Sequence, residues 1–107
     1  MGWTVTTLNA AVDTEIEALP ADMRARPTRL AQLVEQHGLQ ALPRNSFDHL
    51  EDKLWELRIR GRAGIARAIY VATAGQRAVI VRVFIKKTQK TPRPELELAR
   101  KRAREVT

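Results

Sequence analysis

The sequence contains no cysteine among its 107 residues. This absence excludes a disulfide framework, thiolate metal sites and cysteine nucleophiles. No apolar stretch approaches the roughly 18 residues of a membrane-spanning helix, and the first residues lack the basic start and apolar run of a signal peptide. Internal repeats and low-complexity segments are also missing from the sequence. We therefore expect one small domain, residues 1–107, in a reducing, cytoplasmic setting.

Positive charge, in contrast, is abundant and unevenly distributed. The formal net charge is +7. Residues 1–50 carry four Lys and Arg against six Asp and Glu, whereas residues 51–107 carry fifteen against six. Such a field accelerates encounter with a polyanion and makes binding depend on salt, but it does not specify sequence preference or catalysis.

Two helices are predicted after a short N-terminal strand. The β-favouring run of residues 3–8 predicts the strand. Thr14 begins a Thr-x-x-Glu capping box, so a short helix is expected from Thr14 to about residue 19. A second helix is expected from about Asp22 until Gly38, which suits the left-handed position past a helix end. Pro27 lies either in the first turn of a shorter helix or at a kink in a longer one.

The second half of the chain is predicted to form a sheet. Residues 39–52 read as a connecting loop, and three strand-like runs follow at residues 54–60, 65–73 and 76–86. The short, glycine-containing gaps between these runs favour antiparallel hairpins. A last helix begins near Pro94. The order β-α-α-β-β-β-α predicts an α+β fold, with two N-terminal helices on one face of a twisted, mainly antiparallel sheet, a basic opposite face, and the last helix at a sheet edge.

Basic residues recur at every second position of the predicted strands. Leu57 and Ile59 are expected to point into the core while Arg58 and Arg60 point outwards together, because successive side chains alternate between the faces of a strand. In the last strand, the same alternation predicts one apolar face and one face that carries basic residues and an aromatic ring. The apolar set is Val79, Val81, Val83 and Ile85, and the other set is Arg82, Phe84 and Lys86. This pattern indicates a phosphate-rich partner.

Two other features favour structural roles over catalysis. His37, at the end of a helix, and His49, in the predicted loop, are isolated from any constellation of Ser, Asp or Glu. Glu56, two residues before Arg58, is expected to form a structural ion pair with it rather than an acid–base pair.

Three blocks of the sequence resemble the RelE/ParE toxin superfamily, in particular its HigB-like, phage-derived branch. The resemblance covers most of the chain, although the first 25 residues match only in outline. It implies the toxin of a type II toxin–antitoxin pair, an mRNA endoribonuclease that acts at the ribosomal A site without cofactor or metal. It also implies a cognate protein antitoxin with a helix-turn-helix domain. The blocks are Leu54-Trp55-Glu56-Leu57-Arg58, Arg67-Ala68-Ile69-Tyr70 and Phe84-Ile85-Lys86-Lys87-Thr88-Gln89-Lys90-Thr91-Pro92.

Two other functions stay open at this point. The same fold hosts DNA gyrase poisons of the ParE kind, and a non-enzymatic RNA-binding module is a third class.

Carried over by position, the functional basic residues of the family fall at Arg58, Arg60, Arg67, Lys86 and Lys87. Several relatives also use a tyrosine or histidine near the C-terminus. This chain has neither there, so no role is carried over from those groups.

The chemistry of RNA cleavage divides these residues by role. Attack of the ribose 2′-oxygen on phosphorus needs alignment, stabilisation of charge on the phosphoryl oxygens, and proton transfer. Arginine holds two phosphate oxygens at once, whereas crowding by other cations lowers the pKa of a lysine and suits it to proton transfer. Aromatic rings stack on bases. The predicted catalytic residues are Arg58, Arg67, Lys86 and Lys87, and the predicted RNA-binding residues are Arg60, Tyr70, Arg82, Phe84 and Lys90.

Removal of Arg67 or Lys86 is expected to abolish toxicity and to leave folding nearly unchanged, because exposed charges contribute little to stability.

Overall fold

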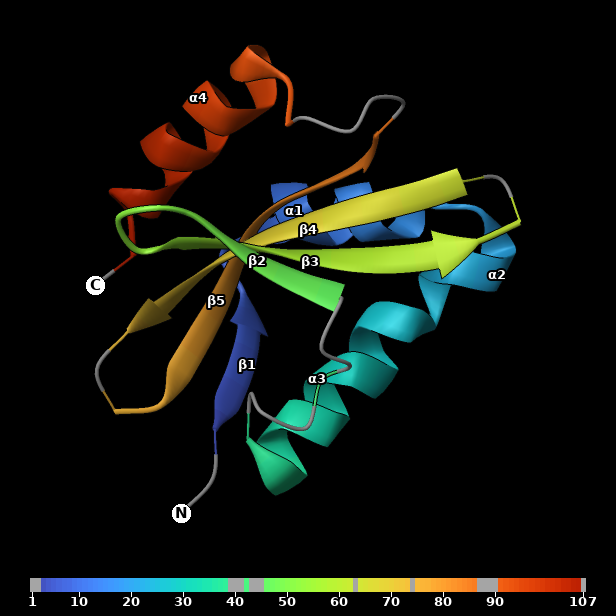
Figure 1. The fold of residues 1–107 in the computed structure, drawn as a ribbon, viewed down its shortest axis with the longest axis horizontal. Coiled ribbons are helices and arrows are strands. Elements are labelled where there is room, and N and C mark those ends of the chain that lie inside the picture. The colour runs from blue at the N-terminus through green and yellow to red at the C-terminus, as the bar shows by residue number, and fades with distance from the viewer. Residues whose placement is uncertain are drawn as a thin grey trace.

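The fold is built on a twisted sheet with strand order β1-β5-β4-β3-β2 (Figure 1). The computed structural model describes residues 3–38, 42, 46–62, 64–73, 75–86 and 91–106, except for the side chain of Lys86. No helix within these ranges is long and apolar enough to cross a membrane. The elements are β1 (Thr4–Thr7), α1 (Ala10–Glu17), α2 (Ala21–Arg24), α3 (Arg26–His37), β2 (Phe47–Glu51), β3 (Leu54–Gly61), β4 (Gly64–Thr73), β5 (Arg77–Lys86) and α4 (Arg93–Ala103).

The predicted α+β class and the mainly antiparallel sheet are confirmed. Strands β2 to β5 pair in antiparallel order, and β1 is added to β5 in parallel. The three strands predicted in the second half of the chain correspond to β3, β4 and β5 within one residue at each end.

Two apolar clusters lie on opposite faces of the sheet. The first face is covered by α1, α2 and α3, whose residues Val12, Met23 and Val34 pack with Leu57 and Ile59. The second face carries an apolar cluster of its own over part of its area. That cluster contains Leu54, Ile69, Val71, Val79, Val81, Phe84 and Ala99.

The predicted position of the last helix at a sheet edge is wrong. Helix α4 lies over the second face, where it contacts β5 and β3 (Figure 1). Its residues Leu96, Ala99 and Ala103 supply the apolar contacts. Because α4 covers part of this face, the prediction of a basic surface holds only for the part that α4 leaves open.

A β-bulge in β5 changes which of its side chains share a face. Ile69 of β4 pairs with Arg82, but the next residue, Tyr70, pairs with Ile80, so Val81 is an extra residue. An extra residue reverses the alternation beyond it. Val81 therefore lies on the second face together with Arg82, whereas Val83 belongs to the first face. The predicted grouping of Val79 and Val81 with Val83 is wrong for this reason.

The predicted capping box at Thr14 is also wrong, because α1 begins earlier. Asn9 is the N-cap residue, and its side-chain oxygen accepts a hydrogen bond from the backbone N–H of Val12 at 3.2 Å. Asparagine is among the preferred residues at this position. Thr14 lies inside the helix, where its hydroxyl donates to the carbonyl of Ala10 at 3.0 Å.

Two further differences concern the connection to the sheet. The expected second helix is divided into α2 and α3, and Pro27 occupies the first turn of α3, where a missing N–H costs nothing. Gly38 ends α3 with a φ of 88°, as expected of a glycine at this place. The expected loop of residues 39–52 contains the strand β2 at Phe47–Glu51. Residues 39–41 and 43–45 of that loop lie outside the described ranges.

Candidate functional site

Residues from three strands meet on the open part of the second face. Arg58 of β3, Arg67 of β4 and Phe84 of β5 are direct neighbours across the sheet. The next row towards the β3–β4 turn begins at Arg60 and ends at the backbone of Lys86. The register therefore brings together basic residues that lie up to 28 positions apart in the sequence. The predicted outward position of Arg58 and Arg60 opposite the core residues of β3 is confirmed.

Arg67 lies beneath this surface in a buried ion pair. Only 7% of Arg67 and 3% of Glu56 are exposed. The two side chains are joined at 3.0 Å between Nη1 and Oε1, and the other carboxylate oxygen of Glu56 accepts from the hydroxyl of Thr91 at 2.5 Å. The expected partner of Glu56 was Arg58, so this pairing is a correction. The Nε of Arg67 has no hydrogen-bond partner among the described residues, which leaves one guanidinium donor unused.

Arg58 is the part of the cluster that faces outwards. Its guanidinium forms an ion pair with Asp48 of β2, and 22% of its side chain is exposed. Partial burial, followed by the nearby charges of Arg67 and Arg60, lowers the pKa of Arg58. Three cations crowded in this way are stabilised by an anion that binds among them.

Arg82 is held by carboxylates instead of being open to a ligand. Its Nε and Nη2 donate to Glu95 of α4 at 2.6 and 3.1 Å, and its Nη1 lies 2.8 Å from Glu15 of α1. The hydrogen bonds that Arg82 donates to Glu95 raise the pKa of Arg82. The guanidinium carbon also lies 5.7 Å from the centroid of the Phe84 ring. Arg82 thus orients the aromatic ring and joins it to α4.

Tyr70 does not lie with the other predicted site residues. It is 5% exposed and belongs to the first-face core, under α3. Burial raises the pKa of Tyr70 to about 12, and its hydroxyl has no hydrogen-bond partner in the described part of the chain. A small cavity of about 30 Å³ adjoins it, lined entirely by apolar residues and Tyr70. This position does not allow the ring to stack on a base without opening the core.

Phe84 is also largely buried, with 8% of its surface exposed. Lys87 and Lys90 lie outside the described residues, as does the side chain of Lys86. The structure therefore gives the site three arginines and a buried aromatic ring, and it describes the backbone position of one lysine.

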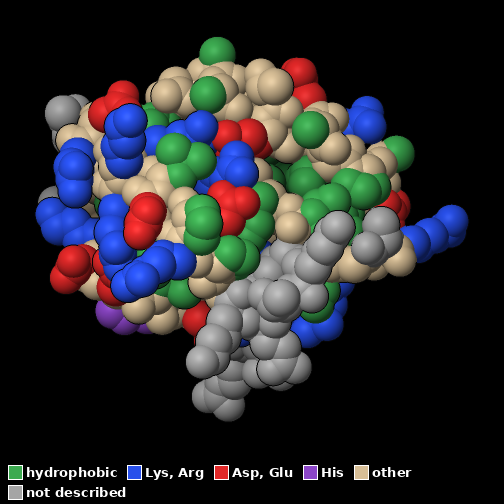
Figure 2. Space-filling view, turned by 90° about the horizontal axis from the view of Figure 1, so that it is seen from above, with side chains coloured by type: hydrophobic (Ala, Val, Ile, Leu, Met, Phe, Trp, Pro, Cys, Tyr) green, Lys and Arg blue, Asp and Glu red, His purple; other side chains and the backbone are tan. Residues whose placement is uncertain are grey.

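Positive charge also gathers on α4, but much of it is paired. Figure 2 shows Lys and Arg side chains over this part of the molecule, at the left of the view, with Asp and Glu side chains between them. Arg100 donates to both oxygens of Glu51 at 2.6 and 2.7 Å. Arg102 lies 2.8 Å from Glu15 and donates to the carbonyl of Val81 at 2.9 Å. These contacts fasten the helix to the sheet.

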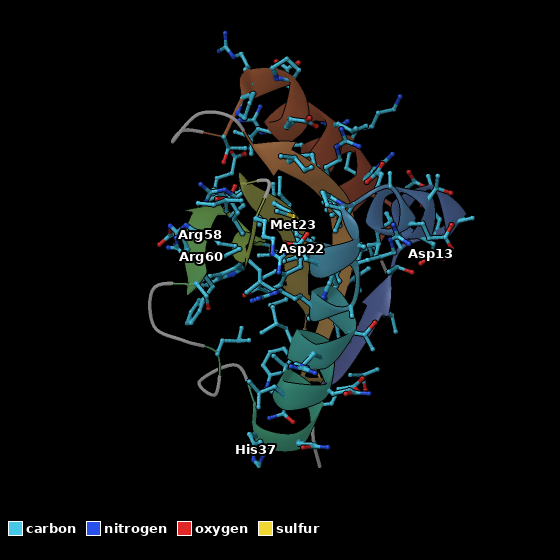
Figure 3. The ribbon with its side chains drawn as sticks, turned by 90° about the vertical axis from the view of Figure 1, so that its right-hand side faces the viewer. Asp13, Asp22, Met23, His37, Arg58 and Arg60 are labelled. Atoms are coloured by element: carbon cyan, nitrogen blue, oxygen red, sulfur yellow. The ribbon has the colours of Figure 1, made fainter. Side chains whose placement is uncertain are left out.

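A second set of arginines adjoins the site, and the sequence pattern did not indicate it. Arg26 and Arg29 of α3 line a groove of about 520 Å³ together with Arg58 and Arg60 of β3. Figure 3 shows Arg58 and Arg60 side by side on β3, with Asp22 of α2 towards the centre of the view. The only signal in the sequence is the spacing of three between Arg26 and Arg29, which places both on one helix face.

Among the described residues, no group of three or more His, Asp and Glu is arranged to hold a metal ion.

Comparisons with known proteins identify the family. A family model described as phage-derived protein Gp49-like (DUF891) matches residues 14–104. No curated protein matches the sequence. Among solved structures, a mutant of the Escherichia coli toxin RelE in the free state is similar to this chain, with a TM-score of 0.56 and 12% sequence identity. The similarity covers 100% of this chain and 100% of the RelE chain. An identity this low establishes a shared fold. The chain thus has the RelE fold and belongs to the phage-derived Gp49-like family, a family of the RelE/HigB toxin type.

Proposed function

We propose that this protein is the toxin of a type II toxin–antitoxin pair and that it cleaves mRNA on the ribosome in the cytoplasm. The observation that carries the proposal is the cross-strand pair of Arg58 and Arg67, with Arg60 in the adjacent row, on the open part of the second face. Membership of a RelE/HigB-type family and the RelE fold support the assignment.

The arginines suit the phosphoryl group at the cleaved bond. In this reaction a bond forms between the ribose 2′-oxygen and phosphorus, and the bond from phosphorus to the 5′-oxygen breaks. Negative charge develops on the phosphoryl oxygens, and positioned donors stabilise it. Arg58 is exposed enough to reach the phosphate once Asp48 releases it, and the unused Nε of Arg67 is a second donor from below.

Proton transfer is assigned to lysine. Lys86 lies on the row of Arg60, at the end of β5, and Lys87 follows it in the sequence. A lysine near several arginines has a lowered pKa, because the neighbouring cations disfavour its charged form. We propose that one of these two lysines accepts the 2′-proton or protonates the leaving 5′-oxygen.

Controlled expression in bacteria tests the proposal. We expect growth arrest and cleavage of translated mRNA, mapped by primer extension, with 2′,3′-cyclic phosphate ends and no cleavage of the same mRNA without ribosomes. Arg58→Ala is expected to reduce cleavage by about a hundredfold to a thousandfold, the loss typical for removal of one stabilising donor. The control is Arg104→Ala, an exposed residue of the α4 end, which removes the same charge.

Two other outcomes would replace this function. Growth arrest with DNA damage and inhibited gyrase supercoiling, and with intact mRNA, indicates a gyrase poison. RNA binding without cleavage or growth arrest indicates a non-enzymatic RNA-binding module.

We also propose a protein antitoxin with a helix-turn-helix domain, encoded next to this chain. An open arginine surface is suited to an acidic or amphipathic segment that covers it. Co-expression of the adjacent reading frame with a tagged form of this protein is expected to restore growth and to recover a complex. If no neighbouring product binds or restores growth, the toxin–antitoxin assignment is rejected.

A further inference from the structure

The groove between α3 and the end of β3 exists because β2 is short. Strand β2 begins at Phe47, which pairs with Leu57, so β3 continues past it without a described partner strand on that side. Helices α2 and α3 form the other wall. The lining residues are Asp22, Ala25, Arg26, Arg29, Leu30, Ser46, Arg58, Ile59 and Arg60.

The charge of this groove is positive and only partly compensated, since Arg58 pairs with Asp48 of β2. Four arginines line it against a single acidic residue, Asp22. The carboxylate of Asp22 already accepts a hydrogen bond from the backbone N–H of Arg62 at 2.6 Å, which fixes α2 against the β3–β4 turn. Arg26, Arg29 and Arg60 are exposed, and none of them forms an ion pair with a described residue.

The groove is continuous with the candidate site. Arg58 and Arg60 line the groove, and their side chains also belong to the second face beside Arg67. A polyanion that lies across Arg58 can therefore continue over the edge of β3 to Arg26 and Arg29. Guanidinium groups in a row along such a path match the repeating phosphates of a nucleic acid strand.

We propose that this groove binds the phosphate backbone of the RNA nucleotides that flank the cleaved bond. Arg26 and Arg29 are the residues that define it, and Arg58 and Arg60 are shared with the cleavage site. This inference rests on the proposed ribonuclease function. It adds the path that the bound RNA strand follows beyond the cleavage site. An acidic protein segment is the competing occupant, but it would not need a path continuous with the site.

The test compares the binding of RNAs that differ in length and in the side on which they are extended. A trinucleotide with a 2′-O-methyl group on every ribose cannot be cleaved by 2′-oxygen attack, and the longer RNAs carry the same modification throughout. Two longer RNAs contain the same trinucleotide, extended by four nucleotides on either the 5′ or the 3′ side. Affinity is measured by fluorescence anisotropy over a series of salt concentrations from 50 mM upwards. The variant is R26Q with R29Q, because glutamine keeps helix propensity close to that of arginine.

We expect the double variant to bind one of the two extended RNAs about three to ten times more weakly and the trinucleotide within about twofold. The slope of log affinity against log salt should fall by about 1.4 for that extended RNA, the value for two lost contacts with single-stranded RNA. The matched control is K101Q with R104Q, which removes two exposed charges near the C-terminal end of α4. It should leave all three affinities within about twofold.

Three results would overturn the inference. One is that wild-type protein binds the extended RNAs no more tightly than the trinucleotide. The second is that the control pair weakens binding as much as the groove pair. The third is that the groove pair leaves RNA binding unchanged but weakens binding of a ten-residue polyglutamate peptide, which assigns the groove to an acidic protein segment.

Failure of the proposed function has a different signature. If Arg67→Ala leaves trinucleotide binding and mRNA cleavage unchanged, the cleavage site is wrong, whatever the groove binds. If Arg67→Ala abolishes cleavage while the groove pair has no effect on the extended RNAs, only the groove inference is wrong.

Discussion

Arg67 shows how one residue serves both stability and the site. Because it is buried against Glu56, the expectation that its removal leaves folding unchanged does not fit the structure. Loss of one partner leaves a buried charge without compensation, which typically costs about 3 kcal/mol. We therefore expect Arg67→Ala to lower the free energy of unfolding by roughly that amount, measured by urea denaturation, besides abolishing cleavage.

A double variant separates the two effects of Arg67. Replacement of Arg67 by Met together with Glu56→Gln removes both charges and keeps similar volumes, so stability should return to within about 1 kcal/mol of wild type. Cleavage should stay absent. Recovery of cleavage in this stable variant would show that Arg67 acts only through folding.

Replacement of Tyr70, in contrast to that of Arg67, is expected to leave both stability and cleavage nearly unchanged. Its buried hydroxyl has no partner among the described residues, so Tyr70→Phe removes an unsatisfied polar group at little cost in packing. We expect unchanged or slightly higher stability, within about 1 kcal/mol, and unchanged cleavage. A loss of cleavage with intact stability would return Tyr70 to the site.

The raised pKa of Tyr70 adds a dependence on pH. Between the ordinary value of 10.0 and the folded value of about 12, the unfolded chain loses the phenolic proton while the folded chain keeps it. Fewer protons bound by the unfolded state mean that stability falls as pH rises. The wild type should therefore lose stability relative to Tyr70→Phe above pH 10, and the difference should be constant below it.

At the scale of elements, α2 depends on a glycine in β3. A Cβ built on Gly61 would lie 2.5 Å from Cγ of Met23 and 2.8 Å from the carboxylate of Asp22. Met23 is fully buried, so it cannot move away without repacking. We expect Gly61→Ala to cost about 1–3 kcal/mol of unfolding free energy, the usual range for overpacking.

A double-mutant cycle with Met23→Ala checks the cause of that cost. The single change Met23→Ala opens a cavity and is destabilising by about 2–5 kcal/mol. In its background, Gly61→Ala should cost clearly less, because the contacts with the Met23 side chain are gone and only the one with Asp22 remains. Additive effects of the two changes would exclude the steric explanation.

The sequence predicted the elements better than it predicted their contacts. Strands β3, β4 and β5 were predictable because apolar alternation and glycine-containing turns are local signals. Strand β2 was not, since Phe47–Glu51 is short and lies at an edge, with mostly polar residues. The packing of α4 on the second face could not be predicted, because its few apolar residues are separated by charged residues and form no clear apolar face.

The candidate site was predictable in part for the same reason. The outward position of Arg58 and Arg60 follows from alternation within one strand. The burial of Arg67 depends on the register between strands, which brings Glu56 within reach, and no local pattern reports a register. The groove arginines Arg26 and Arg29 adjoin the site only through the packing of α3 against the sheet.

At the scale of the whole molecule, Glu15 joins three elements. Its carboxylate in α1 accepts the backbone N–H of Val83 at 3.0 Å and lies 2.8 Å from both Arg82 of β5 and Arg102 of α4. Hydrogen bonds to charged groups contribute about 1.5–3 kcal/mol each when both partners are present.

We therefore expect Glu15→Ala to lower the free energy of unfolding by about 2 kcal/mol or more. For a domain of this size that corresponds to a fall in Tm of roughly 8–16 °C. The control is Glu17→Ala, an exposed acidic residue of the same helix. Equal effects of the two changes in a thermal melt would mean that Glu15 has no special connecting role.

The extra residue at Val81 gives the two halves of β5 opposite rules for which side chains face which side of the sheet. Before Val81 the even-numbered side chains face the N-terminal helices. After it the odd-numbered side chains do. Changes in Ala78, Ile80 or Val83 therefore alter the packing of the N-terminal helices. Changes in Arg82 or Phe84 alter the surface beside Arg67. Deletion of this one residue would join Ile80 directly to Arg82 and restore strict alternation, with Arg82 and Phe84 still on the second face and Val83 still on the first.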